Sequence, residues 1–373
     1  MKTMLKIAVS AVLFVCLSFT ACAVETGEYF DSQLEASGAQ ELYSDLDSET
    51  KDALAELGIS GVDFSSLFDI SPQKVFGFIK SIAEGKIREP LKAAVRVMGI
   101  IIFLSAGEAF LPDGEKMKGL LNTVGVLLIA AAMSVPVYES VSSAVSSVGM
   151  CCTFMKALIP VLAGAVIASG NPMTALSFQS WAFAAAQLIS SVCQSFIIPI
   201  VGAVIAIDIS GALVPDYKLD GITNLIKKTV IAVLSFTATL YVSFLGIKGA
   251  LSSSADSVTV KGVKLIISSA VPVVGGALSE AYSGIIGSLT LVKSTLGVFG
   301  IICVAAITLP SLIQLLLWIF TLKICSAAGE VFLQNETTNL LSALSSALTL
   351  MNVVLIFNGV LFIISMALLL NLK

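Results

Sequence analysis

Histidine is missing from this chain of 373 residues, and charged residues make up only 12% of it. Without histidine the chain can form neither a Ser-His dyad nor an H-E-x-x-H zinc site. The Walker sequence G-x-x-x-x-G-K-[ST] is also missing, which excludes ATP hydrolysis by that route. The sequence therefore predicts a protein that is not an enzyme and has no catalytic residues.

Cysteine is scarce, and its spacing fits no metal site. The chain has seven cysteines, of which Cys16 and Cys22 lie near the N-terminus. Adjacent Cys151 and Cys152 are most simply two small apolar residues, and Cys193, Cys303 and Cys325 stand alone. A pair of carboxylates that share a proton is missing too, because only one aspartate falls inside a predicted span. We expect no metal and no cofactor.

Apolar residues are what the chain has in excess. They make up 57% of it, and the mean hydropathy is +0.98. A soluble protein of this size cannot hide so much apolar surface from water. From about residue 93 to residue 373 we therefore predict an all-α polytopic membrane domain. Membrane lipid is the expected environment, and nucleic acid is not an expected partner.

The first 23 residues have the pattern of a signal peptide. Lys2 and Lys6 precede an apolar stretch of residues 7–19, and Ala21 and Ala23 form a small-residue cleavage site. Cleavage is expected before residue 24. Two alternatives stay open, namely an uncleaved anchor, for which the apolar run is short, and lipidation of Cys22.

An acidic leader follows over residues 24–70. It holds twelve acidic residues between Glu25 and Asp69 against a single basic one, Lys51. Five leucines recur at loosely helical spacing: Leu34, Leu42, Leu46, Leu54 and Leu57. If the signal peptide is cut, this leader lies outside the cytoplasm. It is either a short helical arm that meets a partner or a solvated, partly disordered segment.

An amphipathic helix is predicted over residues 71–92. Ser71 and Pro72 are a good helix start. Basic residues become frequent, and one face is apolar, with Val75, Phe76, Phe78, Ile79, Ile82 and Ile87. We expect this helix to lie on the membrane surface before the first span.

About eight transmembrane helices follow, because a hydrocarbon core needs about 20 apolar residues per helix. We predict them near 94–111, 119–137, 152–169, 173–194, 196–214, 229–247, 296–320 and 350–371. The stretch 263–290 is broken by proline and glycines, and we interpret it as a bent pair of short helices or a re-entrant hairpin. Residues 325–348 suggest an interfacial helix.

Basic loops indicate the orientation. Lys116 and Lys118 lie between the first two predicted spans, and Lys218, Lys227 and Lys228 lie between the fifth and sixth. Both loops are cytoplasmic if the mature N-terminus is exported, as the signal peptide requires. The basic cluster between Lys74 and Arg96 opposes this orientation, since it would lie outside.

An internal duplication is suggested by two pairs of similar segments. Residues 142–148 resemble 253–258, and residues 159–165 resemble 271–277, with offsets of 111 or 112 residues. Parallel repeats are a known transporter architecture. We therefore predict that 119–214 superposes on 229–326, against the alternative that low-complexity membrane segments match by chance.

Ionisable groups at membrane depth are the candidate functional residues, because a charge there usually faces a partner or a water-filled path. Asp208 lies with Ser210 in the fifth span. Glu280 and Tyr282 follow the broken segment that holds Pro272, Gly275 and Gly276, and this group is our candidate lining for a gate or conduit. The alternative for Asp208 is a position at the headgroup level, as we expect for Glu108, Lys156 and Lys293.

Two stretches carry a family resemblance. One is Ser257 to Lys264 (SVTVKGVK), which runs into Val271 to Gly276 (VPVVGG). The other is Leu158-Ile159-Pro160, followed by Gly170-Asn171-Pro172. With the order of signal peptide, leader and polytopic body, they make the chain similar to the stage III sporulation protein AE family of endospore-forming Firmicutes.

The resemblance implies a role in endospore formation within a complex in the mother-cell membrane around the forespore. It also implies partners: ring-forming subunits and an ATPase of the same operon, and stage II sporulation protein Q from the forespore side. Our leading hypothesis is a membrane-embedded core or export-gate-like subunit of this transenvelope channel. The alternatives are a stand-alone secondary transporter for a small solute or ion and a non-conducting membrane scaffold.

Overall fold

The structure is a computed structural model that describes residues 28–68, 70–110, 115–213, 220–270, 275–332 and 334–371. Within these ranges helices are the only regular secondary structure, which confirms the all-α prediction. The signal peptide of residues 1–23, with its cleavage residues Ala21 and Ala23 and with Cys22, lies outside the described residues.

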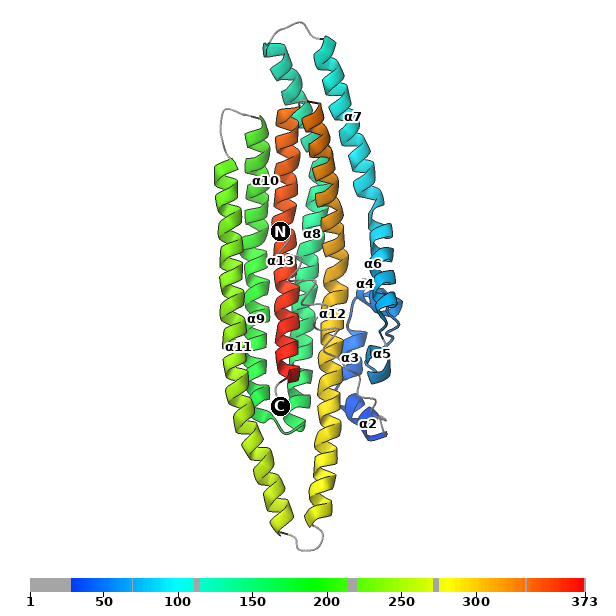
Figure 1. Ribbon diagram of the computed structural model, residues 1–373, viewed down its shortest axis with the longest axis vertical. Helices are drawn as coiled ribbons and strands as arrows, with labels where there is room; N and C mark the ends of the chain where they lie inside the picture. The colour runs from blue at the N-terminus through cyan, green and yellow to red at the C-terminus, as the bar shows by residue number, and fades with distance from the viewer. Residues whose placement is uncertain are drawn as a thin grey trace.

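The helices are labelled as in Figure 1. Five short ones form the N-terminal part: α2 (Glu28–Ala36), α3 (Ala39–Ser44), α4 (Ser48–Glu56), α5 (Phe64–Phe68) and α6 (Pro72–Lys86). The body consists of α7 (Arg88–Phe110), α8 (Glu115–Ala168), α9 (Pro172–Val192), the π-helical turn η1 (Cys193–Ile197), α10 (Ile198–Leu213), α11 (Asp220–Ala270), α12 (Gly275–Val331) and α13 (Asn335–Asn371).

The body is a bundle of long antiparallel helices. Helices α8, α11 and α12 have 54, 51 and 57 residues, which corresponds to roughly 75 to 85 Å at about 1.5 Å per residue. In Figure 1 the end of α7 and the start of α8 lie at the same end of the bundle as the end of α10 and the start of α11. The two basic loops of the sequence therefore flank one end, as the predicted orientation requires.

Five helices in the described ranges are long and apolar enough to cross a membrane, in place of the predicted eight separate spans. The predicted spans 119–137 and 152–169 lie in the single helix α8, although it contains Pro136 and Pro160. The spans 173–194 and 196–214 are joined through η1. The prediction looked for separate runs of about 20 apolar residues, so it divided these helices where serines lower the hydropathy. Serines are nevertheless tolerated inside a packed helix.

The predicted short and interfacial helices are parts of long ones. Residues 263–270 end α11 and residues 275–290 begin α12, so the described parts of the candidate re-entrant segment belong to two long helices. Residues 325–331 end α12, and residues 335–348 begin α13. Cys325, Leu340 and Leu341 there are almost fully buried, so this stretch is core rather than interfacial.

The acidic leader folds into helices α2 to α5 around its own apolar core, so the disordered alternative is wrong. All five leucines at helical spacing are buried, together with Phe30, Ile59, Val62 and Leu67. Every acidic side chain with described burial is exposed: Glu35, Glu41, Asp45, Asp47, Glu49, Asp52, Glu56 and Asp63. The leader packs on α12, where the Ser288 hydroxyl donates to Gln33 Oε1 at 2.7 Å.

The predicted amphipathic helix is present as α6. Ser71 caps it by accepting a hydrogen bond from the Lys74 N–H at 3.4 Å, and Pro72 is in its first turn, which confirms the predicted start. The chain breaks at Ile87, and α7 begins at Arg88. Figure 1 shows α6 running along α12 in line with α7, so α6 continues the direction of the bundle.

The helices of the two proposed repeats run in corresponding directions, but their ends do not show the offset that the sequence motifs have. Both proposed repeats are long helical hairpins, α8 with α9–α10 and α11 with α12. The first helices end at Ala168 and Ala270, an offset of 102 residues (270 − 168), rather than the 111 or 112 of the motifs. Pro160 lies inside α8, whereas Pro272 lies outside the described residues. The duplication stays a prediction.

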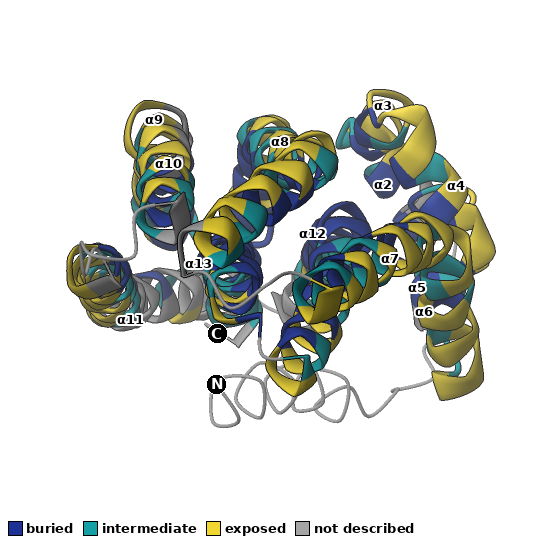
Figure 2. Cartoon of the chain, turned by 90° about the horizontal axis from the view of Figure 1, so that it is seen from above, coloured by how far each residue is buried: buried dark blue, intermediate teal, exposed yellow. Residues whose placement is uncertain are grey.

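Helix α13 occupies the centre of the bundle. It contacts α8, α10, α11 and α12, and Figure 2 shows it between these helices in the view along the bundle. Large apolar side chains are exposed on α7, α8 and α11 but on none of the described residues of α13. The outer helices therefore present apolar faces suited to lipid, and α13 forms the shielded core.

Glycines allow α12 and α13 to approach closely. A Cβ at Gly329 would lie 2.5 Å from Thr338 Oγ1, and a Cβ at Gly297 would lie 2.5 Å from Leu370 Cδ2. Thr338 has little room to move, because it is buried and its hydroxyl points to the Ser326 carbonyl at 3.5 Å. Small residues at such crossings are what lets membrane helices pack.

Replacing Gly329 by alanine is expected to destabilise the bundle by about 1 to 3 kcal/mol, because the new methyl group overpacks a tight contact. The measurement is the thermal unfolding midpoint of the purified protein in detergent. Gly164→Ala is the matched control, since a Cβ there meets nothing within 4 Å and alanine favours the helix. Equal midpoints for the two variants would contradict the close approach.

Candidate functional site

A buried ion pair joins α10 to α11. Lys227 Nζ lies 3.2 Å from Asp208 Oδ2, and their side chains are 11% and 2% exposed. Lys227 was predicted to lie in a loop, but α11 begins at Asp220, so Lys227 lies two turns inside the helix. Asp208, which the sequence singled out, is thus neutralised by a residue that sequence reasoning did not pair with it.

The surroundings of Asp208 differ from those predicted in one respect. Ser210 is exposed, and its hydroxyl donates to the Ala206 carbonyl of its own helix at 2.8 Å. It therefore makes no contact with the carboxylate. A paired charge in an apolar interior holds its two helices in register, because separating the partners leaves an uncompensated charge.

A second buried carboxylate, Asp256 of α11, was missed by the sequence analysis. Its side chain is fully buried, and both oxygens accept backbone N–H groups from the first turn of α9. Oδ1 accepts from Met173 at 3.0 Å, and Oδ2 accepts from Thr174 at 2.8 Å. A carboxylate at a helix N-terminus satisfies free N–H groups and complements the helix dipole. Asp256 therefore fixes α9 to α11.

The turn between α8 and α9 explains why α9 needs a cap from another helix. Gly170 has φ of +90°, a conformation that glycine adopts without strain, and the Asn171 N–H returns to the Val166 carbonyl at 3.1 Å. The Asn171 amide is turned toward Ser169, so it does not cap α9. The signal for Asp256 was available, since it is an isolated acid in a long apolar helix.

The two stretches that carried the family resemblance meet at this point. Gly170, Asn171 and Pro172 form the turn, and Asp256 immediately precedes the segment that begins at Ser257. The hydrogen bonds join residues beside these stretches, because Asp256 accepts from Met173 and Thr174, which are 83 and 82 positions away in the sequence. The resemblance therefore marks a structural junction between α8, α9 and α11.

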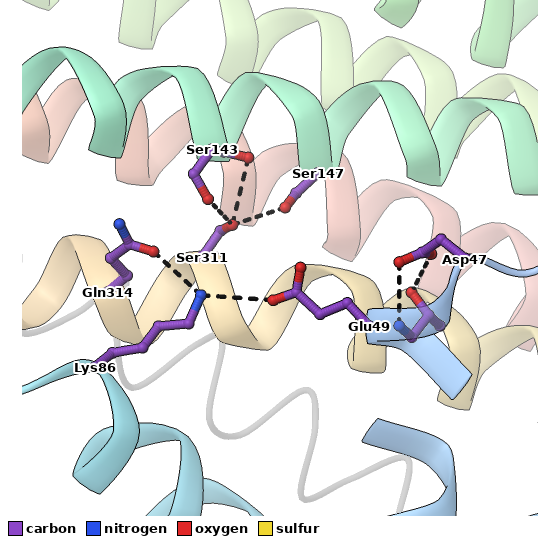
Figure 3. A network of polar contacts seen from close by, with 8 residues as sticks. Asp47, Glu49, Lys86, Ser143, Ser147, Ser311 and Gln314 are labelled. Carbon is purple, nitrogen blue, oxygen red and sulfur yellow. Dashed lines mark hydrogen bonds and ion pairs between the residues drawn. The ribbon is translucent and has the colours of Figure 1, made fainter. Parts of the chain in front are cut away.

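A layer of polar contacts crosses the bundle from the leader to α8 (Figure 3). On α12, the Ser311 hydroxyl lies 3.1 Å from that of Ser143 and 2.7 Å from that of Ser147, both on α8. One turn along α12, Gln314 Oε1 accepts from Lys86 Nζ of α6 at 3.2 Å, and Lys86 also lies 3.7 Å from Glu49 of α4. We call these six residues the polar layer.

The remaining predicted site residues are not placed together by the described structure. Gly275, Gly276, Glu280 and Tyr282 belong to the start of α12, but their side chains, like Pro272, lie outside the described residues. Glu108 and Lys156 are half-buried on α7 and α8. In the described part of the chain, no group of three or more potential ligands for a metal ion occurs.

Replacing Asp256 by alanine is expected to destabilise the protein by about 2 to 6 kcal/mol, because two buried N–H groups lose their partner. Asp256→Asn should be intermediate, since the amide offers one acceptor oxygen. Thermal unfolding in detergent measures both variants. If alanine and asparagine both left the midpoint unchanged, the junction between α9 and α11 would not depend on this carboxylate.

Removing one partner of the Asp208–Lys227 pair is expected to destabilise the protein more than replacing both partners by apolar residues. Asp208→Asn leaves a buried lysine unpaired and should lose about 3 to 5 kcal/mol, whereas Asp208→Leu with Lys227→Met should recover most of that loss. The comparison of the single and double variants by thermal unfolding gives the coupling. Additive effects of the two substitutions would show that the charges do not interact.

Comparison with known proteins agrees with the resemblance. The family model described as stage III sporulation protein AE matches residues 69–372. Among curated proteins, stage III sporulation protein AE of Bacillus subtilis (strain 168) is 22% identical over 293 residues, which cover 77% of this chain and 71% of that protein. No solved structure matches the chain. The matched region begins at the end of the acidic leader and covers the whole bundle. This chain therefore belongs to the stage III sporulation protein AE family and has a role in sporulation.

Proposed function

We propose that this protein is a membrane-embedded core subunit, of the export-gate type, in the channel complex that connects the mother cell to the forespore. It would work with ring-forming subunits and an ATPase from the same operon and with stage II sporulation protein Q from the forespore side. Family membership supports the sporulation role, and five long apolar helices support a place in the membrane.

The observation that carries the proposal is the attachment of the acidic leader to the bundle. The leader contacts α12 at Ser288 and, through Lys86, at Gln314. These two α12 residues are 26 positions apart (314 − 288), so the leader is held along roughly 40 Å of one helix. A folded acidic unit fixed to membrane helices offers soluble partners a surface and transmits their position to the bundle.

A stand-alone transporter is the second candidate, and one observation favours it. Asp208 and Lys227 form a charged pair buried between apolar helices. Transporters use charged groups inside the membrane to couple ions to substrates. A scaffold without a transport role is the third candidate, and it requires that both charges serve packing alone.

Deletion of the gene in its spore-forming host is expected to abolish heat-resistant spores and late forespore transcription while engulfment proceeds. The reason is that a channel subunit is needed only after the forespore is enclosed. Spore counts after heating and a late forespore reporter measure the two effects, and a wild-type copy should restore both. Normal sporulation of the deletion strain would overturn the proposed role.

The leader contacts provide a sharper test within the same strain. Lys86→Ala combined with Ser288→Ala should reduce co-purification of the other complex subunits and lower spore yield, with the protein still in the membrane. Lys261→Ala, at an exposed position of α11, is the matched control. Solute uptake by the purified protein alone in liposomes, lost in Asp208→Asn, would instead favour the transporter.

A further inference from the structure

The outward face of α7 is basic at its start and apolar along the rest. Helix α7 contacts α6, α8 and α12 and leaves one side exposed. Arg88, Lys92 and Arg96 follow one another at intervals of four residues, so they lie within about 80° of one another on that side. Beyond Arg96 the exposed residues of α7 are apolar or small: Gly99, Ile102, Phe103, Ala106, Ala109 and Phe110.

Large apolar side chains lie among these cations. Leu91 and Val95 are 61% and 68% exposed. Each precedes a cation by one residue, and both fall on the same outward side of the helix. A molecule that binds at the start of α7 therefore meets positive charge and apolar surface together.

Two of the three cations are not neutralised by the protein. Lys92 donates to Glu89 at 2.8 Å, and Lys86, on the preceding helix, is engaged with Glu49 and Gln314. Among the described residues, neither Arg88 nor Arg96 forms an ion pair. Two guanidinium groups are thus available to an anion from outside the chain.

The basic start of α7 lies level with the polar layer of Figure 3. Lys86, two residues before Arg88, bonds to Gln314 of α12 at 3.2 Å. Ser311, one turn earlier on α12, lies 3.1 Å from the hydroxyl of Ser143 on α8. These contacts connect the start of α7 with one level on both α8 and α12.

The exposed surface of α8 and α12 changes at this level. Toward the end of the bundle where α7 ends, α8 exposes large apolar or aromatic side chains: Met117, Leu120, Val124, Leu127, Leu128, Val135 and Tyr138. The exposed residues that follow are Glu139, Ser142 and Ser146. On α12, no large apolar residue is exposed between Ile285 and Leu316, whereas Leu316, Phe320 and Ile324 are.

Three helices therefore mark one boundary between a polar and an apolar surface on this side of the bundle. Tyr138 lies at the boundary, and tyrosine is enriched where a membrane meets water. The acidic leader covers α12 on the polar side of the boundary, between Ser288 and Gln314. The cations of α7 thus lie at the level that headgroups of a bilayer occupy.

This position accounts for the basic cluster that opposed the predicted orientation. Basic residues beside a span on the exported side are unfavourable for insertion, so a cluster there requires another role. Arginine binds phosphate through two parallel hydrogen bonds. Long basic side chains can keep their stems on apolar surface while their charges reach the headgroups.

We propose that the outward face of α7, formed by Arg88, Lys92 and Arg96 with Leu91 and Val95, binds anionic phospholipids. The guanidinium groups donate to the headgroup phosphate, and the acyl chains lie along the apolar side chains beyond Arg96. Basic residues near a membrane surface attract anionic lipids. The inference depends on α7 crossing the membrane and is independent of the channel role.

The acidic leader of a second copy is the competing occupant, because it also carries exposed carboxylates. Its apolar side chains, however, form its own core, where Phe30, Leu54 and Ile59 are almost fully buried. It has no apolar surface of this kind to cover Leu91 and Val95. A phospholipid offers both an anion and acyl chains, so the lipid fits the whole face.

The test measures which lipids the full-length protein retains. The protein is reconstituted in nanodiscs of phosphatidylcholine with a minor share of phosphatidylglycerol and then transferred to detergent. The lipids that stay bound are identified and counted by mass spectrometry. Arg88→Gln with Arg96→Gln removes the two unpaired cations. Lys74→Gln with Lys80→Gln is the matched control, because it removes the same charge from exposed positions of α6 on the polar side of the boundary.

The wild-type protein and the lysine control should retain phosphatidylglycerol in preference to phosphatidylcholine. The arginine variant should lose that preference by roughly tenfold or more, because two cations at the headgroup level are gone. Arg88→Lys with Arg96→Lys keeps the charge and should keep most of the preference. Retention of the two lipids by the wild type in proportion to their supply would overturn the proposal without any variant.

Two further outcomes would also contradict it. An equal loss in the arginine and lysine variants would show a general effect of charge rather than a lipid site on α7. A dimer of the wild type that the arginine variant loses, with phosphatidylglycerol still bound, would assign the face to a second copy. A protein without lipid preference whose deletion stops sporulation would remove the lipid site and leave the channel role intact.

Discussion

The approach of α12 to α13 is the contact around which the bundle is built. Gly297 and Gly329 of α12 have no Cβ. Leu370 and Thr338 of α13 fill the space that a Cβ would take there. On α12, Gly300 receives Leu158 of α8 in the same way. Small residues allow dispersion contacts over long stretches of backbone, which is the main attraction between helices where lipid removes the hydrophobic effect. Because α13 is enclosed, α8, α10 and α11 pack around it and face lipid themselves.

The length of the helices imposes a second constraint. A hydrocarbon core of about 30 Å covers about 20 residues of a helix, and α8, α11 and α12 are each more than twice as long. The acidic leader indicates where part of the additional helix length lies. Its exposed carboxylates cannot lie in hydrocarbon, so the face of α12 that it covers between Ser288 and Gln314 borders an aqueous region. Helices of this length therefore extend beyond the hydrocarbon core.

The sequence predicted the helical class, the membrane environment and the start of α6, because each depends on local composition or periodicity, and it left a helical arm open as one of two alternatives for the leader. It did not predict the lengths of the helices. Serines at 143 and 147 lower the local hydropathy, but their bonds to Ser311, 168 and 164 residues away, give them partners inside the bundle. The partners of Asp208 and Asp256 depend on contacts between helices, which no local pattern encodes. Asp256 and the α8–α9 turn show this most clearly, because they are far apart in the sequence and come into contact only in the folded chain.

The two buried carboxylates bear on what the interior can do. Asp208 is paired with a lysine and Asp256 with the N-terminus of a helix, so both serve to join helices. The polar groups that stay without partners among the described residues are neutral amides and hydroxyls, and most are on α13. A path must bind its cargo weakly enough to release it. Neutral polar groups meet that requirement better than a fixed charge, which would hold a counter-ion. Because both buried carboxylates of the described residues are engaged in joining helices, these features favour the proposed conduit over an ion-coupled transporter.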